Sequence, residues 1–534
     1  MHFRATSPYD LHRPSKCEKR VALRHRGVPE ADPSEFVELL RRLGERHERA
    51  HCNTLADVRD LSPFKGDAEA HERETLAAIR AGAPAVYQAR FSAEVILDGE
   101  THDLVGEPDF LILAPGGGYF VRDSKLARHV GGGRHPEIVL QLQLYGWLYE
   151  RAVGAPPAGL EVHCGTGAVI VVPYDGKAAL DHLRELRRMR LAPEDAYEPV
   201  GWSKCAACGY RELCWKRAEA ARDVALLPGV SQDWARRLHE QSVADIPALR
   251  AAFDRPDLRP LFCEPATRKS PERMKPAAVT IRRSLKAHES NAPVPITPLE
   301  LPGPSDCVIL DLEGLPPQLD ELEKVYLWGI KDFRCDPPRY LHADAGIGEE
   351  GDRRGWEDFL RIASGLLEAS PDLRFVHYGN YEQTKINLYL ERFPPLPPGE
   401  GQGEGPLSPL PPGEGRGEGV PPADQIQSPP PTAGGVATGL LSRLFDLHRA
   451  VKRSFALPVP SNSLKQIEKL AGFSRELPDA NGAWAMCRYI EATETSDPAA
   501  RDAIVGRILA YNEEDLDATR AVMEWMRSLP APET

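Results

Sequence analysis

The 534-residue sequence predicts an α/β protein with an N-terminal α/β domain, a small helical middle region and a C-terminal α/β domain. Three observations lead to this prediction. Two strand-like apolar runs and a long helical pattern occupy residues 109–150. A second set of strand, turn and helix patterns begins at residue 307. A chain of this length also exceeds what one ordinary hydrophobic core supports.

We expect the first domain over residues 1–222, the helical region with a basic linker over 223–300, and the last domain over 301–534. In the middle, "LLPGVSQDWARRLHEQSVADIPALRAAF" reads as two short helices around a tight turn. It is similar to a helix-hairpin-helix, although a plain helical spacer explains it equally well. Residues 394–437 repeat a proline-glycine-glutamate unit without apolar periodicity, so we expect a disordered insertion with no catalytic role.

Composition narrows the class of protein. The formal charge of −13 argues against a protein that coats nucleic acid indiscriminately, but it leaves local binding open. The polar, basic N-terminus lacks the apolar run of a signal peptide, and no apolar stretch is long enough to span a membrane. We therefore expect a cytoplasmic protein without a membrane partner. In a reducing compartment, clustered cysteines are candidates for metal ligands rather than disulfides.

The first candidate site lies in "GEPDFLILAPGGGYFVRDSKLA", two strand-like runs joined by a glycine-rich turn. Asp109 opens the first strand, and Asp123 and Lys125 lie two apart on the second, so they share a face. Carboxylates are the oxygen ligands that Mg²⁺ or Mn²⁺ requires. The lysine can orient water or neutralise charge developing on a phosphate. For an isolated D-x-K tripeptide, an ordinary surface ion pair is the alternative.

Two helical patterns flank this hairpin. After it, "EIVLQLQLYGWLYE" places Gln141 and Tyr145 one turn apart on one face. Before it, "LLRRLGERHERAHCNTL" carries His47, a nitrogen ligand candidate, and His71 competes for the same role.

The order histidine, P-D, D-x-K and Q-x-x-x-Y resembles the RecB-like nucleases of the PD-(D/E)XK superfamily. The resemblance implies a restriction-endonuclease-like fold in the first domain. It implies metal binding by His47, Asp109 and Asp123, catalysis by Lys125, and substrate contacts from Gln141 and Tyr145. The sequence departs from the family at Asp123, where the usual residue is glutamate.

The knuckle "GWSKCAACGYRELCWK" holds three cysteines, which cannot complete a tetrahedral metal site alone. Some RecB-like nucleases carry one cysteine before the nuclease core and a knuckle of this spacing after it. That resemblance implies one four-iron, four-sulfur cluster, a structural staple held by Cys17, Cys205, Cys208 and Cys214. Zinc is the alternative, because four thiolates also suit it. We expect no site at the other six cysteines.

A second carboxylate set follows the middle region. In "CVILDLEGLP" an apolar strand ends in Asp311 and Glu313, again on one face. "FVHYGNYEQTKINLYL" gives a strand, a turn and a helix that carries Glu382. On a late helix, Tyr511 and Asp515 lie one turn apart.

Together these segments resemble the ribonuclease-H-like 3′–5′ exonuclease fold, in the divergent branch fused to RecB-like proteins. The resemblance implies that Asp311, Glu313, Glu382 and Asp515 bind two metal ions and that Tyr511 positions the attacking water. Glu382 stands where the family usually has aspartate. Asp446 is a secondary ligand candidate. A domain that binds a strand without cutting it is the alternative.

The resemblances favour a metal-dependent nuclease that hydrolyses DNA, on single strands or ends, in repair or recombination. DNA is the favoured partner, and the sequence leaves protein partners open. One rival hypothesis is a nucleic-acid-binding scaffold in which one or both sites are inactive. The other is a zinc-stapled RNA-processing nuclease.

Overall fold

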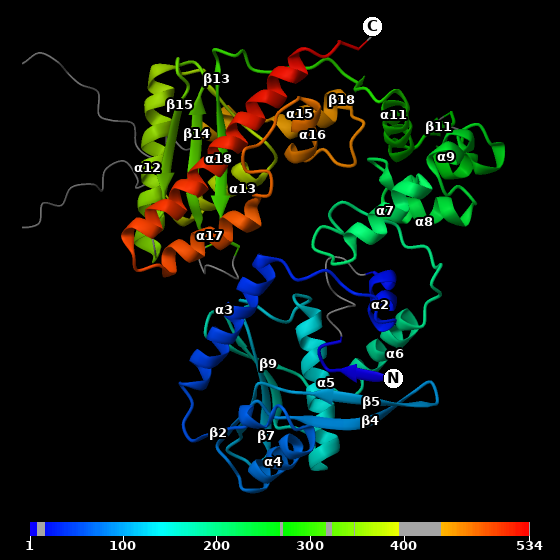
Figure 1. Ribbon diagram of the computed structural model, residues 1–534, viewed down its shortest axis with the longest axis vertical. Helices are drawn as coiled ribbons and strands as arrows, with labels where there is room; N and C mark the ends of the chain where they lie inside the picture. The colour runs from blue at the N-terminus through cyan, green and yellow to red at the C-terminus, as the bar shows by residue number, and fades with distance from the viewer. Residues whose placement is uncertain (8–16, 267–270, 317–322, 347, 395–438, 533–534) are drawn as a thin grey trace, which may run out of the picture. The chain divides into compact units, whose positions relative to one another are not determined.

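The structure is a computed structural model, and it forms two compact units (Figure 1). The first comprises residues 1–294 with 315–323 and 456–461, and the second comprises 295–314, 324–455 and 462–534. The residues described are 1–7, 17–266, 271–316, 323–346, 348–394 and 439–532. The predicted insertion at 394–437 lies, apart from residue 394, outside these ranges. Among the described helices, none combines the length and apolar character needed to cross a bilayer.

A mixed sheet forms the centre of the first unit. Its strand order is β2 (Val58–Asp60), β3 (Ala85–Tyr87), β6 (Phe110–Leu113), β7 (Tyr119–Lys125), β8 (Gly159–Cys164) and β9 (Val169–Val172). β6 and β7 are antiparallel, as the predicted hairpin requires, whereas β7 and β8 are parallel. The crossover between these parallel strands contains α5 (Pro136–Val153). The sheet therefore holds the D-x-K strand between two neighbours.

The local sequence explains the hairpin and the helix after it. Gly117 and Gly118 adopt positive φ angles of 88° and 74°, which only glycine accepts readily, so "APGGG" turns the chain between β6 and β7. α5 is apolar on most of its surface and almost wholly buried, and it ends at Gly154 in the left-handed conformation.

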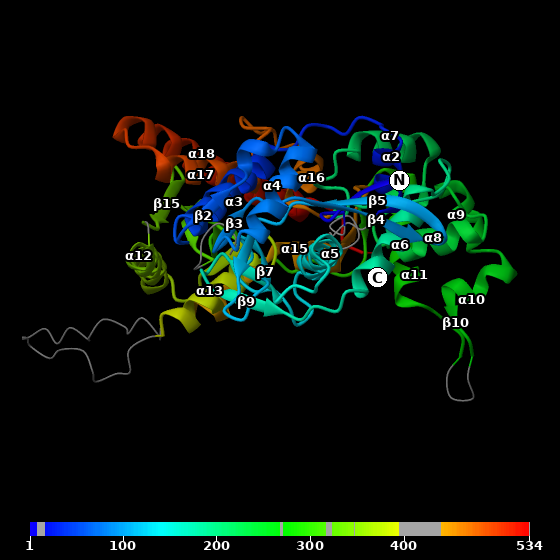
Figure 2. The same ribbon diagram turned by 90° about the horizontal axis from the view of Figure 1, so that it is seen from below.

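The first unit also contains a second, smaller sheet and further helices. β1 (His2–Arg4), β5 (Glu100–Gly106) and β4 (Phe91–Leu97) form a second, smaller sheet, in which β4 and β5 make the long hairpin seen in Figures 1 and 2. The helices are α2 (Glu18–His25), α3 (Glu35–Cys52), α4 (Ala68–Arg80), α6 (Ala178–Arg190) and α7 (Arg211–Ala221).

The helical middle region has a hydrophobic cluster of its own. It contains α8 (Gln232–Glu240), α9 (Ile246–Ala252), α10 (Arg259–Phe262) and α11 (Pro276–Ser290), with the short strands β10 (Cys263–Glu264) and β11 (Arg273–Met274). Leu238, Leu249 and Phe262 are buried together. Ser231 and Asp245 cap the starts of α8 and α9, so the two short helices expected here are present. Phosphate binding by their turn stays a prediction.

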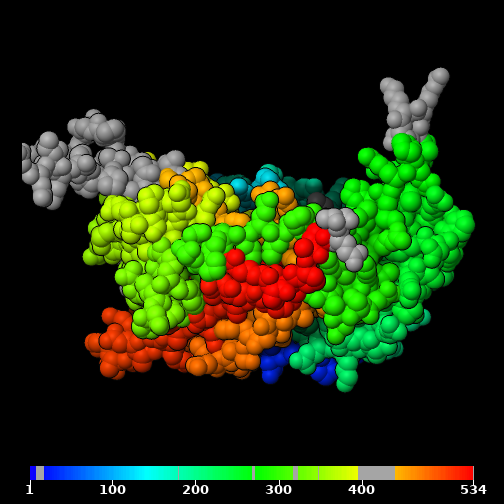
Figure 3. All heavy atoms as spheres, turned by 90° about the horizontal axis from the view of Figure 1, so that it is seen from above, coloured from blue at the N-terminus to red at the C-terminus, as the bar shows by residue number. Residues whose placement is uncertain are grey.

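The second unit also has a mixed central sheet. Its order is β15 (Arg339–Asp344), β14 (Val325–Asp332), β13 (Cys307–Gly314), β16 (Arg374–His377) and β17 (Leu444–Asp446). β13, β14 and β15 are antiparallel, and β16 and β17 run parallel to β13. α12 (Gly348–Ala369) lies on one side and α18 (Pro498–Arg527) on the other (Figure 1). Figure 3 shows the outer side of α18, in red, at the surface.

The described part of the second unit contains further helices, of which the last two pack on α18. They are α13 (Tyr381–Arg392), α15 (Leu447–Ser454), α16 (Leu464–Leu470) and α17 (Gly482–Glu494). Side chains on β13 alternate, so Leu310 and Leu312 pack into the core with Phe359 of α12. Asp311 and Glu313 consequently face the side covered by α18. The strand pattern alone thus separates core residues from candidate ligands.

Candidate active sites

The hairpin of the first unit brings its two aspartates together with the lysine. The backbone N–H of Ser124 donates to Asp109 Oδ2 at 2.8 Å, which ties the start of β6 to the end of β7. Asp123 is 1 % exposed, and the Lys125 ammonium forms an ion pair with its carboxylate. Burial of the Asp109 carboxyl, and then the negative charge of Asp123, raises the pKa of Asp109 well above its usual value; Lys125 opposes this rise.

α5 adds the two polar residues predicted to contact substrate. Gln141 Nε2 donates to the Tyr145 hydroxyl at 2.7 Å, and both side chains are buried. Burial and the negative charge of Asp123 raise the pKa of Tyr145, so its hydroxyl stays protonated beside the acids. A Cβ at Gly106 would lie 2.8 Å from the Tyr145 ring, so only glycine lets β5 pack here. Within the described chain, Gln141 Oε1 is buried without a hydrogen-bond partner.

Glu48 and Gln88 belong to this site, although the sequence did not single them out. The Gln88 amide contacts Glu48 Oε1 and also donates to Asp109 Oδ1 at 3.3 Å. The backbone carbonyl oxygen of Gln88 lies 2.6 Å from His71 Nε2, so His71 holds the Gln88 backbone in place. Glu48 lies among alternating charges on α3 that read as a solvated helix surface. The sequence signal that could have identified Glu48 is its position directly after His47, a predicted metal ligand.

His47 contacts a different set of residues. Its ring stacks on His163 with centroids 4.6 Å apart, and His163 Nδ1 lies 3.0 Å from Ser124 Oγ. Because successive side chains on a strand face opposite sides, Ser124 lies on the face of β7 away from Asp123. The described contacts of His47 thus lie across the sheet from the carboxylates. Its role as a metal ligand stays a prediction.

The four cysteines of the predicted cluster lie close to one another. Cys17 begins α2, where its sulfur accepts from Arg20 N at 3.4 Å, and burial raises the pKa of its thiol to about 11. Negative charge on Cys205 contributes to that rise, and charge on Cys205 and Cys208 does the same for Cys214. The chain therefore brings the lone cysteine to the knuckle, across nearly two hundred residues of sequence.

In the second unit, three carboxylates meet where β13 passes α18. Ligand oxygens of Asp311, Glu313 and Asp515 all lie within 4.8 Å of one another. Burial, followed by the charges of its two neighbours, raises the pKa of Asp311 well above its usual range. Burial, and then the negative charge of Asp515, raises the pKa of Glu313 as well. Like charges held this close repel one another, and a divalent cation would relieve that repulsion.

Glu382 adds a fourth carboxylate to this site. β16 ends at His377 and α13 begins at Tyr381, so the first turn of the helix holds Glu382. Its Oε2 lies 3.1 Å from His377 Nδ1, and its negative charge contributes to the raised pKa of Asp311. The H-x-x-x-Y-E pattern therefore places its acid near enough for its charge to act on Asp311 and Glu313, but outside the group of three carboxylates whose oxygens lie within 4.8 Å of one another.

α18 contributes more than the predicted pair. Tyr511 and Asp515 share a side-chain hydrogen bond, and burial raises the pKa of Tyr511. Between them, Asn512 Nδ2 donates to Asp311 Oδ2 at 2.7 Å. A Cβ at Gly329, opposite Asp311 on β14, would lie 1.9 Å from Asn512 Oδ1, so glycine admits this amide. A glycine within the apolar strand "VYLWGIKD" was a signal for close approach by another group.

A buried arginine and a half-buried lysine from an earlier part of the sequence also act on the second site. Arg475 forms an ion pair with Asp515 at 2.6 Å and with Glu468 at 2.7 Å, and its side chain is 4 % exposed. Although burial opposes it, the bond with Glu468 raises the pKa of Arg475. Burial lowers the pKa of Lys465, whose charge acts on Glu313 and Asp515. Sequence spacing gave no reason to group these residues.

Asp446, the secondary candidate, lies at the end of β17 beside His377 in the strand register. Its Oδ1 accepts from Arg449 N at 3.0 Å and from Gly379 N at 3.3 Å, so it caps α15. Capping explains this acid without a metal, and its ligand role stays a prediction.

Comparisons with known proteins agree with both domains. Residues 16–215 match the family model of the PD-(D/E)XK nuclease superfamily, and residues 424–527 match a model of the RNase_H superfamily. The second match begins after β13, which carries Asp311 and Glu313. These matches confirm the predicted fold class and the predicted fusion of the two families. The iron–sulfur assignment stays a prediction.

The other comparisons add little. A search of curated proteins gave no match. One solved structure, titled "Crystal structure of SSO0001", is 15% identical; the alignment covers 34% of this chain and 96% of that chain. Its TM-score of 0.19 is too low to support an argument about the fold. The family matches and the acidic sites lead to one conclusion: this chain joins a PD-(D/E)XK nuclease superfamily domain to an RNase_H superfamily domain, and both support a nuclease activity.

Proposed function

We propose that the protein is a divalent-metal-dependent nuclease that hydrolyses phosphodiester bonds of DNA, at single strands or ends, in repair or recombination. The observation that carries this proposal is the convergence of Asp109, Asp123 and Lys125 in a domain of a nuclease superfamily. The acidic cluster of the second unit adds independent support. A cytoplasmic location fits the proposal.

Both sites offer donors that fit Mg²⁺ or Mn²⁺. The carboxylates are hard oxygen ligands, and the pKa values of Asp109 and Asp311 are raised first by burial and then by repulsion from neighbouring carboxylates, which a cation would relieve. We assign Asp109 and Asp123 to the first site; Glu48 lies beside them, connected to Asp109 through the Gln88 side-chain amide. When bound, the metal polarises the phosphate and lowers the pKa of its water.

The chain's own residues supply the remaining functions of the first site. The Lys125 ammonium lies against Asp123 and can neutralise charge as it develops on a phosphate oxygen. Gln141 Oε1 is buried without a hydrogen-bond partner in the described chain, so it can accept a hydrogen bond from a substrate strand. Tyr145 holds the Gln141 amide in position.

For the second domain we propose 3′–5′ exonuclease activity. Asp311, Glu313, Glu382 and Asp515 provide the ligand set, and Tyr511 orients the attacking water. Asn512 keeps the Asp311 carboxylate in place through its 2.7 Å hydrogen bond.

One observation favours a second candidate function for this domain. Arg475 already forms an ion pair with Asp515 and therefore competes with a cation for that carboxylate. A domain of this kind could bind a strand without cutting it. Retention of strand binding without metal-dependent hydrolysis would identify that case.

We also propose that Cys17, Cys205, Cys208 and Cys214 hold one four-iron, four-sulfur cluster as a structural staple. A knuckle with one distant cysteine is less typical of zinc than two C-x-x-C pairs, so zinc is the alternative. Anaerobic purification with iron, sulfide and zinc analysis distinguishes the two.

The activity is tested with end-labelled single-stranded and double-stranded DNA, and with RNA of the same sequence. We expect products from DNA in Mg²⁺ or Mn²⁺ and none in a chelator. Binding of DNA without hydrolysis in every divalent metal would support the scaffold hypothesis instead. Preferential hydrolysis of RNA, with zinc in the purified protein, would support the RNA-processing hypothesis.

A further inference from the structure

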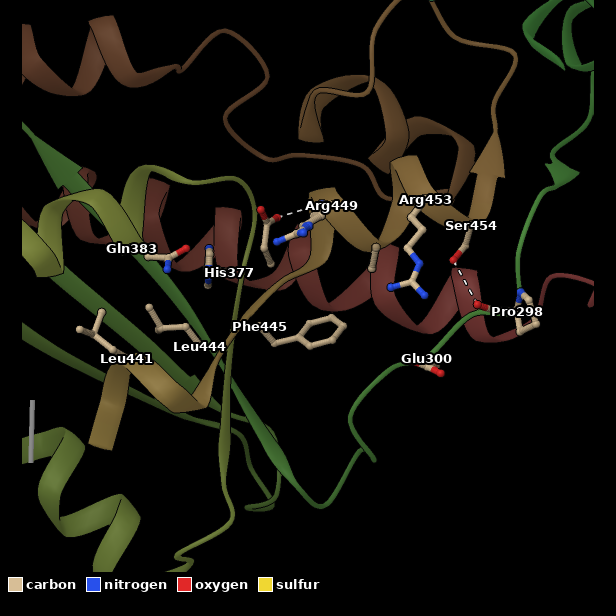
Figure 4. Close-up of a pocket in the computed structure, with 12 residues that line it drawn as sticks. Pro298, Glu300, His377, Gln383, Leu441, Leu444, Phe445, Arg449, Arg453 and Ser454 are labelled. Carbon is tan, nitrogen blue, oxygen red and sulfur yellow. Dashed lines mark hydrogen bonds between the residues drawn. The ribbon is translucent and has the colours of Figure 1, made fainter. Parts of the chain in front are cut away.

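A cavity of about 330 Å³ lies in the second unit between α15, β17 and the segment before β13 (Figure 4). It has the size of a small-molecule site, enough for a single nucleotide but not for a folded protein surface. Its wall includes His377, which also contacts Glu382, and Gln383, the next residue on α13. The cavity therefore adjoins the second acidic site.

Two arginines extend from α15 over this cavity. Arg449 and Arg453 are four residues apart, so they lie one turn apart on the same side of the helix (Figure 4). Both are exposed, and within the described chain neither guanidinium has an acidic partner. Most arginines around the second acidic site are paired, as Arg475 is with Asp515. Two free guanidinium groups at one cavity are donors suited to a phosphate.

The remaining wall is apolar. Phe445 is half-buried on β17, and in Figure 4 its ring lies below the two guanidinium groups. Leu441 and Leu444 extend the apolar surface beside it. An aromatic ring of this kind is a platform on which a nucleobase can stack, whatever its identity. Cationic and apolar walls in one cavity of this size match the two halves of a nucleotide.

We propose that this cavity binds one nucleotide of a DNA strand whose scissile phosphate lies at Asp311, Glu313 and Asp515. Arg449 and Arg453 hold the phosphate of that nucleotide, and Phe445 stacks on its base. The inference rests on the proposed nuclease function, because it assigns a substrate position beside the same site. It gives the second domain a means of holding a strand that does not depend on the metal ligands.

Two acids also line the cavity and set the charge balance. Asp446 is engaged by two backbone N–H groups, which offset part of its charge. Glu300 is exposed and lies near Arg453 and Ser454 in Figure 4. Its charge opposes phosphate binding. Glu300→Gln is therefore expected to strengthen binding about two- to threefold, as removal of one exposed like charge does.

The test locates the strand by photocrosslinking to the full-length protein. A single-stranded oligodeoxynucleotide carrying 5-iododeoxyuridine near its 3′ end is bound in Ca²⁺ and irradiated, and the crosslinked peptide is identified by mass spectrometry. We expect a crosslink at Phe445. The double variant Arg449→Gln/Arg453→Gln should lower its yield at least fivefold. Lys452→Gln is the matched control, since it removes one positive charge from the same helix outside the cavity and should leave the yield unchanged.

Absence of a crosslink at Phe445, or equal yields in the double variant and the wild type, would overturn the inference. Hydrolysis is measured separately in Mg²⁺. Crosslinking that depends on the arginines, without hydrolysis in any metal, would retain the cavity and reject the nuclease. Hydrolysis with an unchanged KM in the double variant would retain the nuclease and reject the cavity as a substrate site. Equal melting temperatures of the variants show that folding is not the cause.

Discussion

The two acidic sites differ in how the chain neutralises their carboxylates. In the first unit, Lys125 lies on the same strand as Asp123, and its side chain is 23 % exposed. In the second unit, Arg475 lies forty residues before Asp515 and is 4 % exposed, and it contacts Glu468 as well. A partly exposed cation can move to meet a phosphate, whereas a buried one with three acidic partners is fixed in place. The comparison indicates that Lys125 takes part in catalysis and that Arg475 stabilises the folded structure.

The strongest test of this difference is activity at the first site. Asp123→Asn keeps the size of the side chain but removes the anionic ligand that Lys125 contacts. We expect hydrolysis measured in an Asp515→Asn background to fall by about 10³-fold, the order of loss when one group that stabilises the transition state is removed. Asp103→Asn, at an exposed position on β5, is the control and should change nothing. Comparable rates in both variants would contradict the assignment.

The second prediction concerns folding stability. Arg475→Met leaves the buried Glu468 and Asp515 without their cation, so the free energy of unfolding should fall by about 3–5 kcal/mol. Lys125→Met also leaves a buried carboxylate, that of Asp123, without its cation, but it affects one such group rather than several, so its cost should be smaller, while it abolishes hydrolysis at the first site. Denaturant unfolding of the two variants measures this difference. Equal losses of stability would remove the distinction between the two cations.

The third prediction uses pH and metal. Because the pKa of Asp311 and Glu313 is raised in the folded protein, the folded state binds protons more tightly than the unfolded state. Their contribution to stability is therefore present below the unfolded pKa of about 4 and is lost as pH rises through the folded pKa. Mn²⁺ binds the deprotonated acids, so it should restore about 2.7 kcal/mol at a hundred times its Kd.

Thermal melting of the metal-free protein between pH 5 and pH 8, with and without Mn²⁺, measures this effect. Asp311→Asn should flatten the pH dependence. Stability that rises over this range in the wild type, and rises equally in Asp311→Asn, would show that the acids are not destabilised as described.

The smallest predicted effect comes from Gly329. Alanine there would place its Cβ on the Asn512 amide, so the amide must move from Asp311; we expect a cost of about 1–3 kcal/mol. Activity at the second site should fall, whereas activity at the first site should not change. Gly506→Ala, on α18 with open space around it, is the control. An unchanged second-site activity in Gly329→Ala would show that the Asn512 hydrogen bond is dispensable.

Local patterns predicted much of both sites. The alternation of Leu310 and Leu312 with Asp311 and Glu313 follows from the period of a strand, and the spacing of Tyr511 and Asp515 follows from the period of a helix. The hairpin and its D-x-K face were predictable for the same reason. The family resemblances connected these segments, because periodicity does not say which strand meets which helix.

Residues defined by contacts between distant segments were not predictable. Asn512 and Asp311 are 201 positions apart, and their hydrogen bond depends on a glycine on a third element. In the sequence, nothing apart from its position after His47 distinguishes Glu48 from the other charged residues of α3. Only the structure shows that the Gln88 amide connects Glu48 to Asp109. The direction of His47 depends on how α3 rotates against β7, which spacing along the sequence does not fix.

Direct binding of Mn²⁺, followed by electron paramagnetic resonance of the free ion, tests the claim that both acidic sites hold divalent cations. The account predicts that the wild type depletes the free signal, that Asp123→Asn and Asp515→Asn each remove part of this binding, and that the double variant removes nearly all of it. If the double variant binds as much Mn²⁺ as the wild type, with the same affinity, the carboxylate clusters are not metal sites and the proposed hydrolysis has no basis in them.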